Sequence, residues 1–173
     1  MKFSTREDID APREAVFAHL TDFEAWERGA LRRGAEVQRI DTLSRPGPGM
    51  SWKSAFQWRG KRRQMVVRLD RYDLPSAVSF SARASNIEAQ FEVELLEMAA
   101  RRTRVIVRLE IRPLTLTARL FLQTMKLARG RSEARFRKRV AQVAAEIAAR
   151  HGDRLLGHRP EPLRPHPLRG SAG

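Results

Sequence analysis

Apolar and polar residues alternate along most of the chain between Met50 and Ile111, with the period of two that β-strands have. The longest run places Met50, Trp52, Ser54, Phe56 and Trp58 on one side and Ser51, Lys53, Ala55, Gln57 and Arg59 on the other. The same alternation recurs in residues 65–69, 78–82, 87–95 and 105–111. This pattern is typical of antiparallel strands that bury one face and leave the other in water. Turn residues at 45–49, 60 and 74–76 separate the runs, so we expect a meander of consecutive strands.

The segment before these strands predicts the end of one strand and two short helices. After Ile9, Pro12 suits the first position of a helix, where its missing N–H would have no partner in any case. The next apolar residues follow at helical spacing. Thr21 and Glu24 have the spacing of a capping box, which predicts a second helix that carries Phe23.

From Leu114 to about Arg150 the apolar period becomes helical, which predicts a long terminal helix. One stripe, expected to pack on the sheet, contains Ala118, Leu122, Met125, Phe136, Val140, Val143 and Ile147. A second stripe on roughly the opposite side contains Leu116, Leu120 and Leu127, with Thr124. Gly130 falls where the second stripe ends and predicts a bend, because glycine within a helix is about 1 kcal/mol less favourable than alanine. The second stripe must contact something else: a ligand cavity, another subunit or a lipid surface.

Four features follow one another along the chain: the run Ala11-Pro-Arg-Glu-Ala-Val-Phe17, the strand Trp52-Lys-Ser-Ala-Phe56, the turn Leu74-Pro75 and the long terminal helix. Together they resemble the START-like helix-grip superfamily (SRPBCC), which includes polyketide cyclase- and dehydratase-like proteins, pollen-allergen-like carriers and lipid-transfer domains. The resemblance implies an α+β fold: a curved antiparallel sheet of about seven strands wrapped around a long C-terminal helix, with two short helices after the first strand. It also implies a largely apolar cavity that binds a hydrophobic or amphipathic small molecule, such as a lipid, quinone or polyketide-like compound.

The residues expected to contact such a ligand lie on the inward side of the strands or on the second stripe of the helix. They are Trp52, Phe56, Trp58, Met65, Val67, Phe80, Phe91, Val93, Leu120 and Thr124. Pockets of this kind are mostly apolar, with a few placed polar groups. The alternative is that the same side chains fill a solid core. Glu7 shares the parity of Phe3 and Ile9, so the pattern directs one carboxylate inward.

The sequence carries no catalytic signature that we recognise. It has no cysteine, which excludes disulfides, thiolate nucleophiles and cysteine-bound metals. His151, His158 and His166 have a spacing that fits no metal site, and neither a glycine-rich phosphate loop nor a nucleophile elbow is present. We therefore assign no catalytic residue, metal or cofactor. By resemblance alone, a cyclase- or dehydratase-like reaction on the bound molecule stays open as an alternative to binding.

The charge of the chain adds a third hypothesis. Its formal net charge is +14, and the basic residues between Arg119 and Arg139 are opposed by Glu133 alone. A solvated helix face is one interpretation, and peripheral contact with an anionic membrane is the other. Specific nucleic-acid binding is not expected, because aromatic residues are not interleaved with the arginines and no binding motif accompanies them.

Composition predicts the boundaries of the folded part. We expect one domain over residues 1–152 and a disordered tail over residues 153–173, because the tail is rich in proline and poor in apolar residues. The first residues are charged and lack an apolar signal core, and no stretch is long and apolar enough to span a bilayer, which predicts a cytoplasmic protein. The sequence leaves the oligomeric state open.

Overall fold

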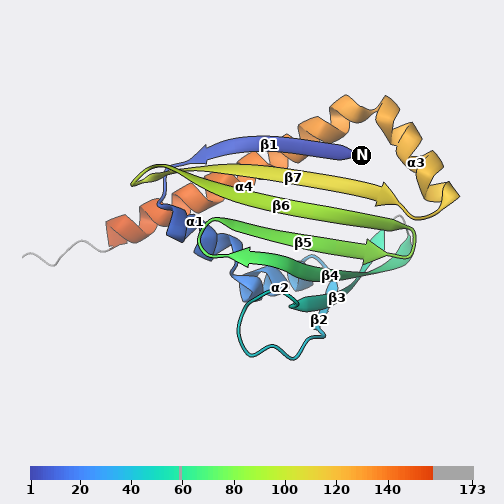
Figure 1. Ribbon diagram of the computed structural model, residues 1–173, viewed down its shortest axis with the longest axis horizontal. Helices are drawn as coiled ribbons and strands as arrows, with labels where there is room; N and C mark the ends of the chain where they lie inside the picture. Colours follow the sequence, from blue (N-terminus) through green and yellow to red (C-terminus); the bar gives the residue numbers. More distant parts are fainter. Residues whose placement is uncertain (59, 158–173) are drawn as a thin grey trace, which may run out of the picture.

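The computed structural model describes residues 1–58 and 60–157, with the side chains of Trp58 and residues 153–157 outside the description. The elements are β1 (Lys2–Ile9), α1 (Arg13–Leu20), α2 (Phe23–Arg32), β2 (Glu36–Arg39), β3 (Ser51–Trp58), β4 (Lys61–Asp73), β5 (Ala77–Ala84), β6 (Ile87–Ala99), β7 (Arg102–Pro113), α3 (Leu116–Leu127) and α4 (Arg129–Gly157). Figure 1 shows one sheet in front and the helices behind it. The expected α+β class, with a long C-terminal helix, is confirmed.

The strands form a single antiparallel sheet in the order β1-β7-β6-β5-β4-β3-β2. Strands β2 to β7 are the expected meander, and β1 pairs with β7. The register places alternating residues of neighbouring strands on a common face: Phe80 lies opposite Leu69 and Phe91, and Phe91 lies opposite Leu109. We call the face toward the helices the inner face and the opposite one the outer face. Register shifts after Leu69 and after Glu97 increase the local twist of the sheet.

The two short helices begin differently from the sequence prediction. Pro12 is the cap that precedes α1 rather than its first helical residue. The predicted capping box of Thr21 and Glu24 is wrong, because Asp22 caps α2 and its side chain accepts a hydrogen bond from Ala25 N at 3.0 Å. Thr21 ends α1, so its hydroxyl donates backward to the Phe17 carbonyl at 2.8 Å.

The terminal helix is divided into α3 and α4. The break falls at Ala128, two positions before the glycine at which we expected a bend. Helix α4 continues past residue 152, the expected end of the domain, to Gly157. The rest of the predicted tail, residues 158–173, lies outside the described residues. None of the helices in the described part of the chain combines the length and apolarity that a membrane span requires.

The hydrophobic core lies at one end of the sheet, beneath α1 and the second half of α4. Val16, Phe17 and Leu69 are fully buried there, and Ile147 of α4 is 3% exposed. The ring of Phe136 packs on that of Phe3 with centroids 5.7 Å apart, which joins α4 to β1. The first helical stripe is therefore the packed one, as predicted. The second stripe is open to solvent: Leu116, Leu120 and Leu127 are 75%, 66% and 89% exposed.

This division between the two stripes predicts opposite effects on stability. We expect Ile147→Ala to lower the free energy of unfolding by roughly 2–5 kcal/mol, because it leaves a void in the core. We expect Leu120→Ser to change it by less than about 0.5 kcal/mol, because that side chain is already in water. Urea unfolding followed by circular dichroism measures both. A larger loss for Leu120→Ser than for Ile147→Ala would show that the two faces are assigned backwards.

Candidate ligand-binding site

The inner face of the sheet is sealed at one end and uncovered at the other. Leu69, Val78 and Val105 lie at the sealed end and are 0%, 2% and 4% exposed. Further along β4 and β5, Val67 and Ala82 have the same inward parity but are only half-buried. The same loss of cover occurs along β6, β7 and β3. Apolar side chains therefore face the helices without being enclosed by them.

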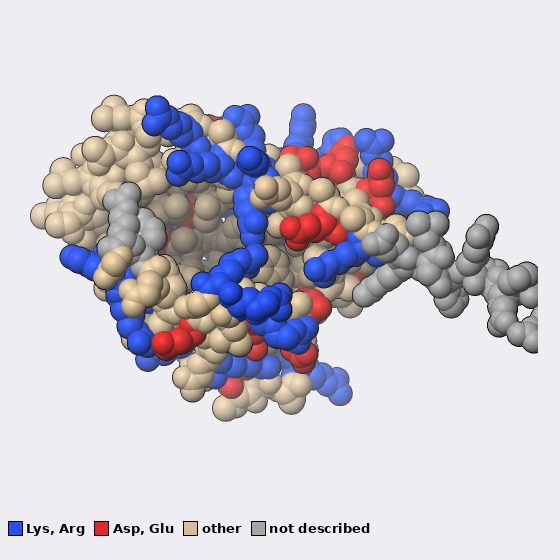
Figure 2. Space-filling view, turned by 180° about the vertical axis from the view of Figure 1, so that it is seen from behind, with Lys and Arg blue, Asp and Glu red and all other residues tan. Residues whose placement is uncertain are grey.

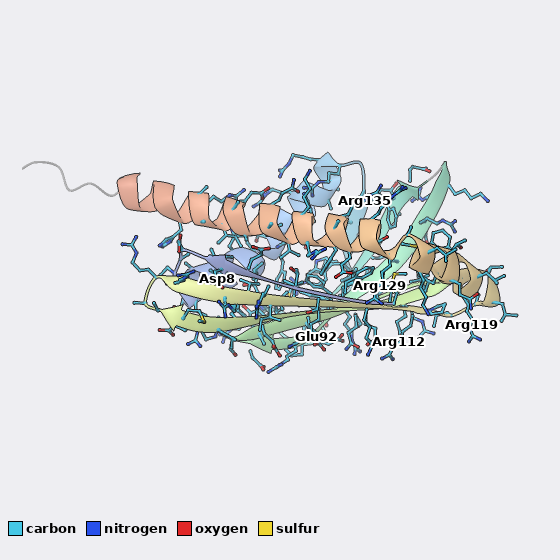
Figure 3. All side chains as sticks on the ribbon, turned by 90° about the horizontal axis from the view of Figure 1, so that it is seen from above. Asp8, Glu92, Arg112, Arg119, Arg129 and Arg135 are labelled. Atoms are coloured by element: carbon cyan, nitrogen blue, oxygen red, sulfur yellow. The ribbon has the colours of Figure 1, made fainter. Side chains whose placement is uncertain are left out.

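The uncovered area is a hollow on the helix side of the molecule, visible in the space-filling view (Figure 2). The helices contact chiefly strands other than β4 and β5: α4 lies against β1, α1 against β6 and β7, α2 against β2, and α3 against β7. Beyond the sealed end, where rings of α1 and α2 contact Tyr72 and Phe80, the strands β4 and β5 receive little cover. Figure 3 shows α4 extended over the inner face, with Arg129 and Arg135 on it and α3 beyond the end of the sheet. Lysine and arginine side chains gather around the mouth of the hollow (Figure 2).

Five of the predicted ligand contacts share the inner face of the sheet. Phe56, Met65, Val67, Phe80 and Phe91 are all half-buried residues of the inner face. Their positions agree with the predicted inward parity of β3 to β6. The side chain of Trp58, another candidate, lies outside the described residues, although its backbone pairs with Lys61 in β3 and β4.

Four other candidates do not line the hollow in this way. Trp52 and Val93 are 7% and 3% exposed and belong to the packed core. Leu120 lies on the solvent side of α3, because the helix buries Ala118 and Leu122, about 200° around its axis from Leu120. Thr124 is exposed on the same helix, and its hydroxyl donates to the carbonyl of Leu120 at 2.9 Å. The expectation that α3 presents its second stripe to the ligand does not fit this arrangement.

Phe23 of α2 is a component of the site that sequence reasoning missed. Its ring centroid lies 5.3 Å from that of Trp52, 6.4 Å from that of Tyr72 and 6.3 Å from that of Phe80. Phe80 continues the cluster to Phe91 at 6.5 Å. The aromatic cluster thus extends from α2 across the inner face of β4, β5 and β6. The available signal was the position of Phe23 at the start of an amphipathic helix. The sequence does not show which strands that helix covers.

Polar groups are sparse on the inner face. Ser54 is 8% exposed there and lies opposite Met65 in the register. Glu7 points inward as its parity predicted, is half-buried and lies opposite Val105. Within the described part of the chain, no cluster of histidine and acidic residues could hold a metal ion. The inner face therefore offers a bound molecule mostly apolar contacts.

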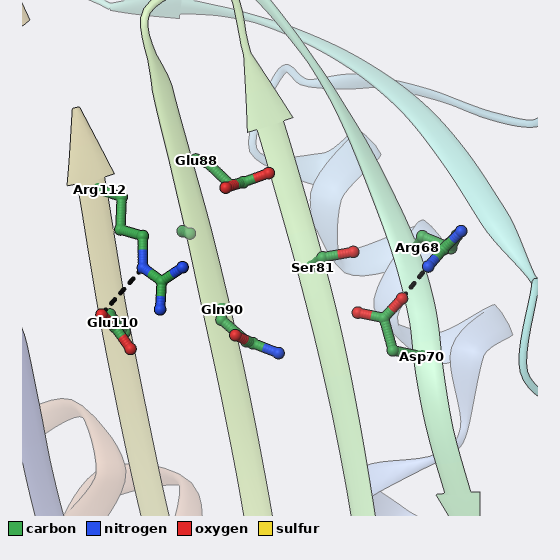
Figure 4. Close-up of a pocket in the computed structure, with 8 residues that line it drawn as sticks. Arg68, Asp70, Ser81, Glu88, Gln90, Glu110 and Arg112 are labelled. Atoms are coloured by element: carbon green, nitrogen blue, oxygen red, sulfur yellow. Dashed lines mark hydrogen bonds and ion pairs between the residues drawn. The ribbon is translucent and has the colours of Figure 1, made fainter. Parts of the chain in front are cut away.

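The outer face carries a second depression, of about 340 Å³, which is polar (Figure 4). Two ion pairs line it: Arg68 Nε donates to Asp70 Oδ1 at 2.8 Å, and Arg112 Nε donates to Glu110 Oε1 at 2.9 Å. The hydrogen bond from Arg112 lowers the pKa of Glu110 below its ordinary value. Because charged and polar side chains line it, this depression does not offer an apolar molecule a favourable environment.

Comparison with solved structures supports the helix-grip fold. The Zhui aromatase/cyclase from Streptomyces sp. R1128 superposes with a TM-score of 0.61 at 14% identity, over 87% of this chain and 94% of its own. A protein from Thermus thermophilus gives 0.59 at 16% identity, over 86% and 98%. A START superfamily protein from Mycobacterium smegmatis gives 0.50 at 12% identity, over 78% and 95%. At these identities the likeness concerns the fold alone. No curated protein matches the sequence.

The family model described as "Polyketide cyclase / dehydrase and lipid transport" matches residues 1–148. That match covers the sheet, the short helices and most of α4. The chain therefore belongs to the polyketide cyclase / dehydrase and lipid transport family.

Proposed function

We propose that the protein binds a hydrophobic or amphipathic small molecule in the hollow between the middle of the sheet and α3–α4. The observation that carries this proposal is the uncovered inner face. Removing apolar surface from water stabilises a protein or complex by about 25 cal/mol per Å². An apolar hollow that holds only water does not gain this free energy. A ligand with an apolar body would recover it. Membership of a family that includes lipid transport supports the same function.

The proposed contacts are the half-buried inner-face residues rather than the whole predicted set. Phe56, Met65 and Val67 would contact the ligand from β3 and β4, and Phe80 and Phe91 from β5 and β6. These side chains combine aromatic faces with flexible or branched aliphatic groups, which suits a molecule of mixed shape. The indole of Trp52 would support this floor from the core behind it, since its Nε1 donates to Glu27 Oε1 at 2.6 Å and is fixed against α2.

A cyclase- or dehydratase-like reaction is the alternative within the same hollow. It would require a group that transfers protons close to the bound molecule. Glu7 is the inward carboxylate of β1, but its partner across the register is the apolar Val105 of β7. A lone carboxylate beside an apolar strand lacks the second titratable group that acid–base catalysis commonly uses. The geometry therefore favours binding over catalysis.

Two adjacent residues of β4 allow a matched test of the hollow. Val67 faces inward and is half-buried, whereas Val66 faces outward and is 41% exposed. We expect the wild-type protein to bind the neutral dye N-phenyl-1-naphthylamine with a rise in fluorescence. We expect Val67→Trp to weaken this binding at least about tenfold, since the indole fills the hollow, and Val66→Trp to leave it unchanged. Equal affinities in the two variants, or no binding by the wild-type protein, would contradict the proposal.

A second proposed function is peripheral contact with an anionic membrane through α3 and the start of α4. Here the exposed side chains of Leu116, Leu120 and Leu127 lie on the same helix as Arg119 and Lys126. Apolar side chains that enter the interface and cations that meet the headgroups are the combination found in interfacial helices. The location beside the hollow would bring its mouth close to the lipid surface (Figures 2 and 3).

Vesicle co-sedimentation tests this contact. We expect the protein to sediment with phosphatidylglycerol vesicles and not with phosphatidylcholine vesicles, and to be released at about 1 M salt, where the Debye length is about 3 Å. The double variant Leu120→Ser/Leu127→Ser should sediment less while keeping the unfolding midpoint of the wild type. Sedimentation that is unchanged by these substitutions would remove α3 as the contact surface.

A further inference from the structure

Arg63 lies on the inner face of β4, where parity also places Lys61 at the exposed start of the strand. Arg63 lies opposite Phe56 in the register, two residues before Met65. Its neighbours Arg62 and Gln64 are exposed on the outer face, whereas Arg63 is partly buried. The alternation that directs Met65 inward therefore directs this guanidinium inward as well.

The guanidinium of Arg63 has a buried donor without an acceptor. Its Nε is shielded from solvent, and no described residue accepts a hydrogen bond from it. The outward arginines of the same strand differ: Arg62 pairs with Glu36 at 2.6 Å, Arg68 with Asp70 at 2.8 Å and Arg71 with Asp73 at 2.6 Å. The sheet thus supplies carboxylates to arginines that water already solvates, and no described residue supplies one to the shielded Nε of Arg63.

An unsatisfied buried donor on a cation is unfavourable, because the group loses water and gains nothing in return. In the described part of the chain, Arg13 also has a buried Nε without a partner, but Nη2 of that residue lies 3.4 Å from a carboxylate oxygen of Glu97. No corresponding ion pair is formed by Arg63 among the described residues. Its natural partner is a planar oxyanion, since the guanidinium fork matches two carboxylate oxygens at once.

We propose that the ligand of the hollow is an anionic amphiphile, with a carboxylate that pairs with Arg63 and an apolar body that lies on the floor formed by Met65, Val67 and Phe91. The inference rests on the function proposed above and adds the charge of the ligand and the residue that recognises it. The inner-face positions of β3 to β7 around the hollow carry no acidic residue, so its floor does not repel an anion. The basic side chains around its mouth attract one (Figure 2).

The test compares two ligands of equal chain length, one with an anionic headgroup and one with a neutral headgroup. Dodecanoate and 1-dodecanol share one chain, and each is titrated below its aggregation limit against the full-length protein loaded with N-phenyl-1-naphthylamine. The variants are Arg63→Met, which keeps an unbranched side chain as far as the position of Nε and removes the cation, and Arg63→Lys, which keeps the charge without the fork. Arg62→Met is the control, because it removes an equal charge from the next residue on the other face. Circular dichroism and the melting temperature confirm that each variant is folded.

We expect the wild-type protein and Arg62→Met to bind dodecanoate at least about tenfold more tightly than 1-dodecanol. In Arg63→Met this preference should vanish while the affinity for 1-dodecanol is retained, and Arg63→Lys should be intermediate. Equal affinities of the wild-type protein for the two ligands, or a preference that survives in Arg63→Met, would overturn the role of Arg63 while leaving a neutral binding site in place. Failure of both ligands and of the dye to bind the wild-type protein would overturn the proposed function itself.

Discussion

The structure depends on the apolar packing of α1 and α4 against one end and one edge of a wide, curved sheet. Phe3 and Phe136 join α4 to β1, and Ile147 inserts into the core that α1 closes with Val16 and Phe17. These contacts are apolar and closely packed, so they set the position of the whole terminal helix. One helix fixed in this way cannot also cover the middle strands. The uncovered inner face is therefore a consequence of where the core was built.

The hollow and its chemistry follow from that geometry. The aromatic cluster around Phe23 and Phe80 separates the sealed core from the open floor, and the strands on the open side continue to present apolar residues inward. In a protein whose core were merely incomplete, collapse of α3 and α4 onto these strands would bury them. Instead α3 turns Leu116, Leu120 and Leu127 outward into solvent. Basic residues then surround an apolar surface, an arrangement suited to molecules that have an apolar body and a charged end.

The sequence predicts the strands of the sheet and the parity of their residues. It does not predict which of the inward residues stay uncovered at the proposed site. Period-two alternation predicted the strands and the inward parity of Met65, Val67 and Phe80, because strand geometry alone determines parity. It could not tell which inward residues a helix covers, so Trp52 and Val93 were grouped with residues that are only half-buried. That distinction depends on tertiary packing between segments far apart in the chain.

Two further differences have local causes. The capping residue of α2 is Asp22 and not Thr21, because the hydroxyl of Thr21 is engaged with the preceding helix. Arg63 was not among the predicted ligand contacts, although the same parity that selects Met65 selects it. A charged residue on an apolar strand face is visible in the sequence, but whether a carboxylate lies near it is visible only in the structure.

The uncovered inner face is the proposed ligand site, and intermolecular NOEs measure its contacts residue by residue. The sample is methyl-labelled protein mixed with unlabelled dodecanoate below its aggregation limit. We expect NOEs from the aliphatic chain to the methyl groups of Met65, Val67 and Leu109, and none to those of Val78 and Val105 at the sealed end. NOEs confined to the exposed leucines of α3, or their absence throughout, would contradict a ligand site on the inner face.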